Sequence, residues 1–236
     1  MAEAIRDVTK NIDRKSDILC VFIGLPAVQE EFKSKKQEIK KEILKQKGIS
    51  KIAKSKIIID SDQITAFRSG TDQKDGVLVI VGTGHVVHGW RKNKEAHING
   101  WGWLADEGSA FWTGHRALQK VFKELDGRGQ KTLITKLISK KFSLKFRGEK
   151  LLAKIYSTDF VEVVASFSIL VDEADKKNDK IAKAILVEAG KELALSVKTA
   201  VNKLNFKKER FPLDLVGGMF KSDSLLKQFK KEVKKF

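Results

Sequence analysis

Residues 77–85 have the sequence V-L-V-I-V-G-T-G-H, and residues 99–112 have the sequence N-G-W-G-W-L-A-D-E-G-S-A-F-W. The first segment is an apolar, β-branched run that stops at Gly82-Thr83-Gly84, which predicts a buried strand followed by a flexible turn. Glycine lets backbone N–H groups approach an anion without a Cβ atom in the way. The turn therefore suits a phosphate, although it lacks the Lys-Ser/Thr of a P-loop. A hairpin turn into a strand at 85–90 is compatible with the same residues.

The second segment combines glycines, indoles and two adjacent carboxylates. Gly100-Trp101-Gly102 lets the backbone pass close to a ligand beside a flat aromatic wall, and Asp106-Glu107 can accept paired hydrogen bonds from vicinal hydroxyls. In the alternative interpretation the indoles are core aromatics and the acidic pair interacts with a helix N-terminus. The co-occurrence of these features favours a binding site for a sugar.

Asp60 is the candidate for acid–base chemistry. It follows the apolar run Ile57–Ile59, and α/β sheets place ligand-binding groups at the carboxyl ends of their strands. Such a carboxylate can accept the proton of a hydroxyl that attacks a phosphoryl group. Asp62 is a second candidate in the same turn, and a helix-capping role explains Asp60 equally well.

Composition limits the classes of protein. With 236 residues, 42% of them hydrophobic, the chain can form one large domain or two small ones. No run approaches the roughly 20 uncharged residues of a membrane helix, and Met1–Arg14 is charged, so a cytoplasmic protein without a membrane partner is expected. The single cysteine, Cys20, excludes an intramolecular disulfide and is expected to be a buried thiol.

The net charge of +17 raises the possibility of nucleic-acid binding. The lysines are interleaved with apolar positions in helical patterns, however, so nucleic acid is not the expected partner, and attraction of a polyphosphate ligand is the simpler use of this charge. His85 and His88 are three residues apart, which on a strand places them on opposite faces, so no metal site is predicted.

Strand and helix patterns alternate in the first part of the chain, which predicts an α/β fold with a sheet covered on both faces. The residues after Phe111 are mostly helical, and a domain boundary is expected near Gly89–Asn99. The expected strands are 18–24, 56–59, 77–81 and 213–216. The expected helices are 2–12, 30–47, 64–68, 113–125, 131–141, 161–174, a long helix capped by Asn178 and ending near Leu204, and a terminal helix from Ser222.

With Asp60, Gly82-Thr83-Gly84, Gly100-Trp101-Gly102, 106–110 (D-E-G-S-A) and 216–222 (V-G-G-M-F-K-S) in this order, the chain resembles the N-acetylglucosamine kinase and BadF/BadG/BcrA/BcrD ATPase family. This family belongs to the actin-like, sugar kinase and Hsp70 ATPase superfamily. The resemblance implies a ribonuclease-H-like, actin/hexokinase-type fold in two lobes, 1–88 and 89–236, that close over a cleft. The C-terminal lobe is expected to be helix-rich. The N-terminal lobe is expected to be truncated, because the family's Asp-x-Gly-Gly-Thr-Lys phosphate loop is not found in residues 1–20.

The resemblance also implies an activity, which is phosphorylation of an amino sugar such as N-acetylglucosamine by ATP and Mg²⁺. A homodimer is the expected assembly. Two alternatives stay open. One is the ATPase activator of a radical dehydratase, which a single cysteine disfavours because such activators share an iron–sulfur cluster through paired cysteines. The other is a degenerate, non-catalytic protein that binds a sugar or a nucleotide.

Each motif then acquires an expected role from the resemblance. Asp60 matches the general base, and the turn at Gly82, Thr83 and Gly84 matches the second phosphate motif. Five residues would bind the sugar, namely Gly100, Trp101, Gly102, Asp106 and Glu107, and Gly217 and Gly218 would lie beside the adenosine.

Overall fold

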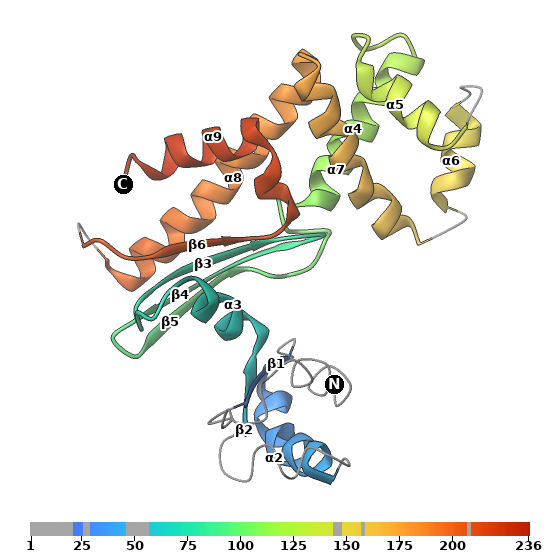
Figure 1. The fold of residues 1–236 in the computed structure, drawn as a ribbon. Coiled ribbons are helices and arrows are strands. Elements are labelled where there is room, and N and C mark those ends of the chain that lie inside the picture. Colours follow the sequence, from blue (N-terminus) through green and yellow to red (C-terminus); the bar gives the residue numbers. More distant parts are fainter. Residues whose placement is uncertain (1–20, 26–28, 46–56, 144–147, 157–158, 207–208) are drawn as a thin grey trace, which may run out of the picture. The chain divides into compact units, whose positions relative to one another are not determined.

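The computed structural model describes residues 21–25, 29–45, 57–143, 148–156, 159–206 and 209–236. The chain divides into two compact units, Met1–Asp72 and Gln73–Phe236. Figure 1 shows both units, with colours that follow the sequence from the N-terminus to the C-terminus. The helix expected at 2–12 and the thiol of Cys20 lie outside the described residues.

The first unit is built on a pair of parallel strands. Strand β1 (Val21–Leu25) pairs with β2 (Ile57–Ser61) in a register that places Gly24 opposite Asp60. Helix α2 (Gln29–Lys45) contributes Ile43 to a small core that also contains isoleucines of both strands. Helix α3 (Asp62–Gly70) follows β2 directly. Apart from the helix at 2–12, the strands and helices expected in this part are confirmed, with ends that differ by a few residues.

The second unit contains a four-stranded sheet in the order β5-β4-β3-β6 (Figure 1). Its strands are β3 (Gly76–Val81), β4 (His85–Arg91), β5 (Lys94–Asn99) and β6 (Leu213–Val216). Strand β3 is parallel to β6, and the other two pairings are antiparallel. The turn between β4 and β5 has positive φ at Lys92 (47°) and Asn93 (63°), as the tight turns of β-hairpins require.

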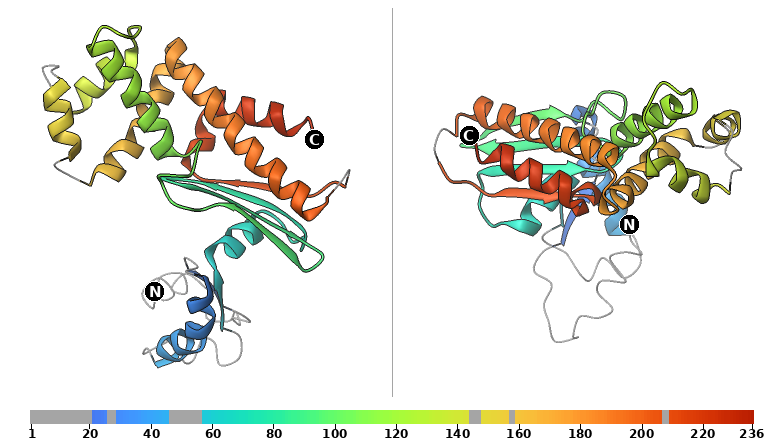
Figure 2. Two further views of the ribbon diagram at one scale, coloured as in Figure 1. Left: turned by 180° about the vertical axis from the view of Figure 1, so that it is seen from behind. Right: turned by 90° about the horizontal axis from the view of Figure 1, so that it is seen from above.

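Helices cover this sheet and extend beyond it. Helix α8 (Lys180–Leu204) packs on β3, β4 and β5, and α9 (Asp223–Val233) packs on α8 (Figure 2). Helix α4 (Ala110–Leu125) packs on α7 (Phe160–Lys176), with α5 (Leu133–Lys141) and α6 (Gly148–Tyr156) beside them. A short 3₁₀ turn, η1 (Gly218–Lys221), follows β6. One continuous apolar core joins the sheet to these helices.

Three expectations differ from the structure. The chain divides at Asp72, and the boundary expected after residue 88 falls inside β4, whose ladder with β3 runs unbroken through Gly89. Helix α8 is capped by Asp179, whose side chain accepts from the N–H of Ala182, while Asn178 has a positive φ just before it. Strand β5 was not predicted, because its sequence contains few apolar residues, and helix α6 was not predicted although Leu151 and Ile155 are apolar at helical spacing.

The crossing of α4 and α7 depends on Gly114. A Cβ atom at this position would lie 1.8 Å from the carbonyl oxygen of Val164. We therefore expect Gly114→Ala to lower the free energy of unfolding by about 1–3 kcal/mol, because the two helix backbones must separate. Urea denaturation measures this change.

Gly148→Ala is the matched control for Gly114→Ala. A Cβ atom there would be in ordinary contact, 3.4 Å from Cδ1 of Leu125. Its stability should stay within about 0.5 kcal/mol of the parent protein. Equal effects of the two substitutions would contradict the close crossing.

Candidate functional site

The buried carboxylate of Asp106 holds two loops of the second unit together. Its Oδ1 accepts from the N–H groups of Gly100 (3.0 Å) and Trp101 (3.1 Å), and its Oδ2 accepts from those of His85 and Gly102 (both 3.2 Å). The residue is 2% exposed. These four donors occupy the acceptor sites of the carboxylate, so Asp106 serves to position the backbone around it.

The Gly82-Thr83-Gly84 turn is docked on the N-terminus of α4. The carbonyl oxygens of Gly82 and Thr83 accept from the N–H groups of Ala110 (2.9 Å) and Phe111 (3.2 Å), and the N-cap Ser109 accepts from Trp112. The turn joins β3 to β4, as the hairpin interpretation predicts.

The turn keeps two donors unused. Among the described residues, the N–H groups of Thr83 and Gly84 donate no hydrogen bond, and both residues are at least partly exposed. A Cβ atom at Gly84 would lie 2.6 Å from Oδ2 of Asp106, so this position needs glycine. The turn therefore presents free donors from a fixed backbone, which is what an anion-binding loop provides.

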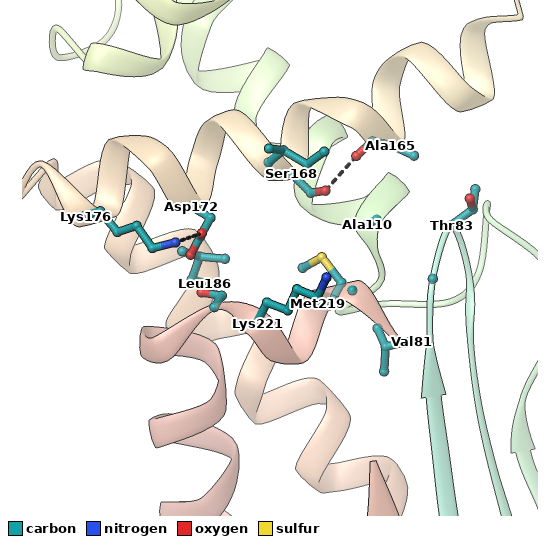
Figure 3. Close-up of a pocket in the computed structure, with 14 residues that line it drawn as sticks. Val81, Thr83, Ala110, Ala165, Ser168, Asp172, Lys176, Leu186, Met219 and Lys221 are labelled. Atoms are coloured by element: carbon teal, nitrogen blue, oxygen red, sulfur yellow. Dashed lines mark hydrogen bonds and ion pairs between the residues drawn. The ribbon is translucent and has the colours of Figure 1, made fainter. Parts of the chain in front are cut away.

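A cavity of about 520 Å³ opens beside this turn (Figure 3). It is lined by Gly82 and Thr83, by α7 through Ser168, Asp172 and Lys176, and by 218–222. Lys176 donates to Oδ2 of Asp172 at 2.7 Å, while Oδ1 of Asp172 and the hydroxyl of Ser222 are buried without a partner. These two atoms are therefore available to hydrogen-bond a polar ligand in the cavity.

Gly217 allows strand β6 to end close to β3. Its φ is +119°, and a Cβ atom would lie 2.1 Å from the carbonyl oxygen of Val81. Gly218 follows at the wall of the cavity, where no atom of the described residues lies within 4 Å of its Cβ position. The break expected after Val216 is thus present, and it leads the chain into the cavity wall.

Asp60 belongs to the first unit, at the end of β2. Its Oδ1 accepts from Lys36 of α2 and from the N–H of Ser61, both at 2.9 Å, and Oδ2 accepts no hydrogen bond among the described residues. Ser61 caps α3 by accepting from Gln63, so Asp60 is not the capping residue. Asp62 is exposed and opens the helix. Of the two carboxylates, Asp60 has the better-fixed side chain and an open oxygen.

The indoles of the second motif have different surroundings. Trp101 is 80% exposed, whereas Trp103 packs against Phe111 and Phe160. Trp112 is half-buried and lies beneath the guanidinium of Arg116. The aromatic wall available to a ligand is therefore Trp101, and the core interpretation holds for the other two.

A smaller cavity of about 200 Å³ lies near Glu107 and contains His85, Asn99, Glu192 and Ser196 among its lining. The hydroxyl of Ser196 donates to Asn99 and lies 3.2 Å from Nε2 of His85. Burial lowers the pKa of His85 despite the charge of Asp106. Burial, together with the charges of Glu107 and Glu188, raises the pKa of Glu192. Polar groups with altered pKa values in a cavity are typical of a binding site.

The two histidines of β4 lie on opposite faces of the sheet, as expected. His85 faces α8 through Ser196, and His88 points to the other face, where its ring packs on Trp90 and His97. Burial and the neighbouring imidazole of His97 lower the pKa of His88 to about 3. His88 also lies next to Glu95, a contact that sequence spacing alone did not predict.

The sequence model of the BadF/BadG/BcrA/BcrD ATPase family matches residues 1–236. The chain belongs to this family. It is 34% identical over 174 residues to the N-acetylmuramic acid/N-acetylglucosamine kinase of Clostridium acetobutylicum, which covers 72% of this chain and 56% of that protein. The chain thus spans little more than half the length of this curated family relative.

Two solved structures have a similar fold. A candidate N-acetylglucosamine kinase from Porphyromonas gingivalis matches with a TM-score of 0.68 and 17% identity, over 99% of this chain and 77% of that chain. Another from Chromobacterium violaceum matches with a TM-score of 0.61 and 20% identity, over 92% of this chain and 72% of that chain. The expected family and α/β fold are confirmed. The ribonuclease-H-like lobes and the residue roles stay predictions.

Among the residues that the structure describes, no helix is long and apolar enough to cross a bilayer.

Within the second unit, the structure places four of the predicted residues on the walls of two cavities. Gly82, Thr83 and Gly218 line the large cavity, while Glu107 lines the small one. Sequence reasoning missed Asp172 and Ser222. Asp172 follows an apolar run in a helix, and no motif distinguishes it from a solvent-facing carboxylate.

The role of Asp106 in holding the two loops can be tested by measuring the stability of a variant protein. Asp106→Asn keeps the shape of the side chain but replaces one acceptor by an N–H donor, which faces backbone donors. We expect a loss of about 2–4 kcal/mol in the free energy of unfolding, measured in urea.

Glu107→Gln is the matched control, because Glu107 is the exposed neighbour. It should change stability by less than about 0.5 kcal/mol. If Asp106→Asn were as mild as this control, the carboxylate would not be what holds the loops.

Proposed function

We propose that this chain takes part in the ATP-dependent phosphorylation of an amino sugar of the N-acetylglucosamine type. The observation that carries the proposal is the cavity beside the Gly82-Thr83-Gly84 turn, with free backbone donors at one end and unpartnered polar atoms along its wall. Family membership and the named activity of the Clostridium acetobutylicum relative support it.

The large cavity fits a nucleotide. Its volume of about 520 Å³ is in the range of ligand pockets. We assign the phosphates to the N–H groups of Thr83 and Gly84, and the adenosine to the side near Gly217 and Gly218. Oδ1 of Asp172 can accept from a ribose hydroxyl or an exocyclic amine, and Ser222 can donate or accept.

Mg²⁺ is part of the proposal but has few protein ligands here. The described lining of the cavity contains one carboxylate, Asp172, which is paired with Lys176. Mg²⁺ usually keeps several waters and is bound largely through substrate phosphates. We therefore expect Mg²⁺ to bind together with the nucleotide, where it would neutralise part of the negative charge of the phosphates.

The sugar is assigned to the loop from Gly100 to Glu107. Trp101 offers an exposed ring face, and Glu107 offers an exposed carboxylate on the same loop. Asp106 holds this loop in shape through its four hydrogen bonds, so we assign it to positioning the sugar site. Glu107 and the loop backbone then make the polar contacts to the sugar.

Asp60 is the proposed general base. Its carboxylate is held by Lys36 and by the N–H of Ser61 through one oxygen, which keeps the other oxygen open for the proton of a sugar hydroxyl. In phosphoryl transfer such a residue orients the attacking hydroxyl and accepts its proton, while the charge on phosphate is stabilised by other groups.

Two other functions make different predictions. An activator of a radical dehydratase would bring iron with it on anaerobic purification, and the single cysteine of the chain disfavours that result. A non-catalytic binding protein would bind sugar or nucleotide without turnover. The predicted homodimer can be measured by light scattering.

Nucleotide binding is tested by calorimetry with Mg-ATP. Asp172→Asn should weaken binding by about 10–100-fold, because it replaces a buried carboxylate by a neutral amide, and Ser222→Ala by about 3–10-fold, because it removes a buried hydroxyl. Asp175→Asn, on the same helix but outside the lining, is the control and should bind normally. Unchanged binding in both cavity variants would refute the assignment of the cavity.

The catalytic role of Asp60 is tested by sugar phosphorylation. Asp60→Asn should lower kcat by about 10²–10⁴-fold while sugar binding persists, because only proton acceptance is lost. Asp62→Asn, two residues away, should keep the parent rate. Normal turnover in Asp60→Asn would show that another group is the base, and binding of sugar and ATP without any turnover in the parent chain would favour the non-catalytic alternative.

A further inference from the structure

We propose that the β4–β5 hairpin binds one divalent transition-metal ion of the zinc type through His88, Glu95 and His97. The ligand atoms of these three side chains all lie within 4.8 Å of one another. The site is separate from the proposed nucleotide cavity, since none of the three residues lines it.

The register of the hairpin creates this cluster. The Lys92–Asn93 turn fixes the pairing of β4 with β5, and His88 stands directly opposite His97. Glu95 is two residues before His97 and therefore lies on the same face of the sheet. His85, Val87 and Gly89 point to the other face, toward α8, so this cluster does not compete with the packing of the helix.

The distances are close to those of a zinc site. Nε2 of His88 lies 3.2 Å from Oε2 of Glu95, and Nε2 of His97 lies 3.7 Å from the same oxygen. With bonds of about 2.0–2.1 Å, two ligand atoms of a tetrahedral zinc ion lie about 3.3 Å apart. His97, whose ring packs on that of His88, must rotate to complete the set, and its ligand atom already lies within 4.8 Å of the other two.

The burial of the three side chains suits such a movement. The side chain of His88 is 5% exposed and packed on Trp90, whereas those of His97 and Glu95 are 52% and 57% exposed. One ligand is therefore held in place, and two can rotate toward an incoming ion.

The donor set selects the class of ion. Two imidazoles and one carboxylate suit Zn²⁺ and its neighbours, whereas Mg²⁺ prefers oxygen ligands alone. Three protein ligands leave a fourth position for water. The bound ion would join β4 to β5, which is the edge strand of the sheet and leads directly to the Gly100 loop.

Calorimetry with ZnCl₂ on the untagged, chelator-treated chain tests this proposal, with Co²⁺ absorption as a spectroscopic readout. We expect uptake of one ion per chain and roughly tenfold or greater weakening in both variants, since His97→Ala removes a ligand and Glu95→Gln replaces an anionic ligand by a neutral amide. Both variants alter exposed side chains, so folding should persist, and circular dichroism checks this.

His115→Ala is the matched control, because His115 is an exposed histidine on α4, outside the cluster. This variant should bind Zn²⁺ as the parent chain does. Zn²⁺ should raise the Tm of the parent chain and of His115→Ala, but not the Tm of His97→Ala. The proposal is overturned if the parent chain takes up no Zn²⁺, if neither cluster variant weakens uptake, or if His115→Ala weakens it equally. ATP binding is unaffected in every variant, so this result is independent of the kinase assignment.

Discussion

The buried carboxylate of Asp106 is the interaction on which the ligand-facing part of the second unit depends. It accepts hydrogen bonds from His85 at the end of the phosphate turn and from three successive residues of the Gly100 loop. Backbone N–H groups in such bends have no ladder partner, and leaving them unpaired in a buried place is costly. One charged side chain satisfies four of them at once and thereby fixes two loops relative to each other.

The fixed loops explain why free hydrogen-bonding groups gather around one cavity. Because the Gly82-Thr83-Gly84 turn is tied to Asp106 on one side and to α4 on the other, the N–H groups of Thr83 and Gly84 remain available. Helix α7 and the segment after β6 add Asp172 and Ser222 with unpartnered oxygens. A folded chain keeps such groups unpaired only rarely, and a ligand that pairs them would gain binding free energy. The net charge of +17 adds attraction for a polyphosphate.

Much of the second unit was predictable from local pattern. The run Val77–Val81 and the glycines after it predicted both the strand and the hairpin turn, because an apolar β-branched run and a glycine turn are local signals. Strand β5 was not predicted, since K-E-A-H-I-N contains few apolar residues and becomes a strand by pairing with β4. The cap of α8 was misassigned to Asn178, because Asp179 also accepts from Thr132 and Leu133, which lie far away in the sequence.

The sequence by itself determined the family, the glycine positions at which the backbone must bend or approach closely, and the residue types available for chemistry. These follow from local order, since each motif is a short run with its own conformational demand. Only the tertiary structure decided how those residues are used. It showed that Asp106 is occupied by backbone donors, that Asp172 and Ser222 face a cavity, and that His88 meets Glu95 and His97. Such meetings depend on strand register and helix packing, which join distant residues and leave no periodic trace in the sequence.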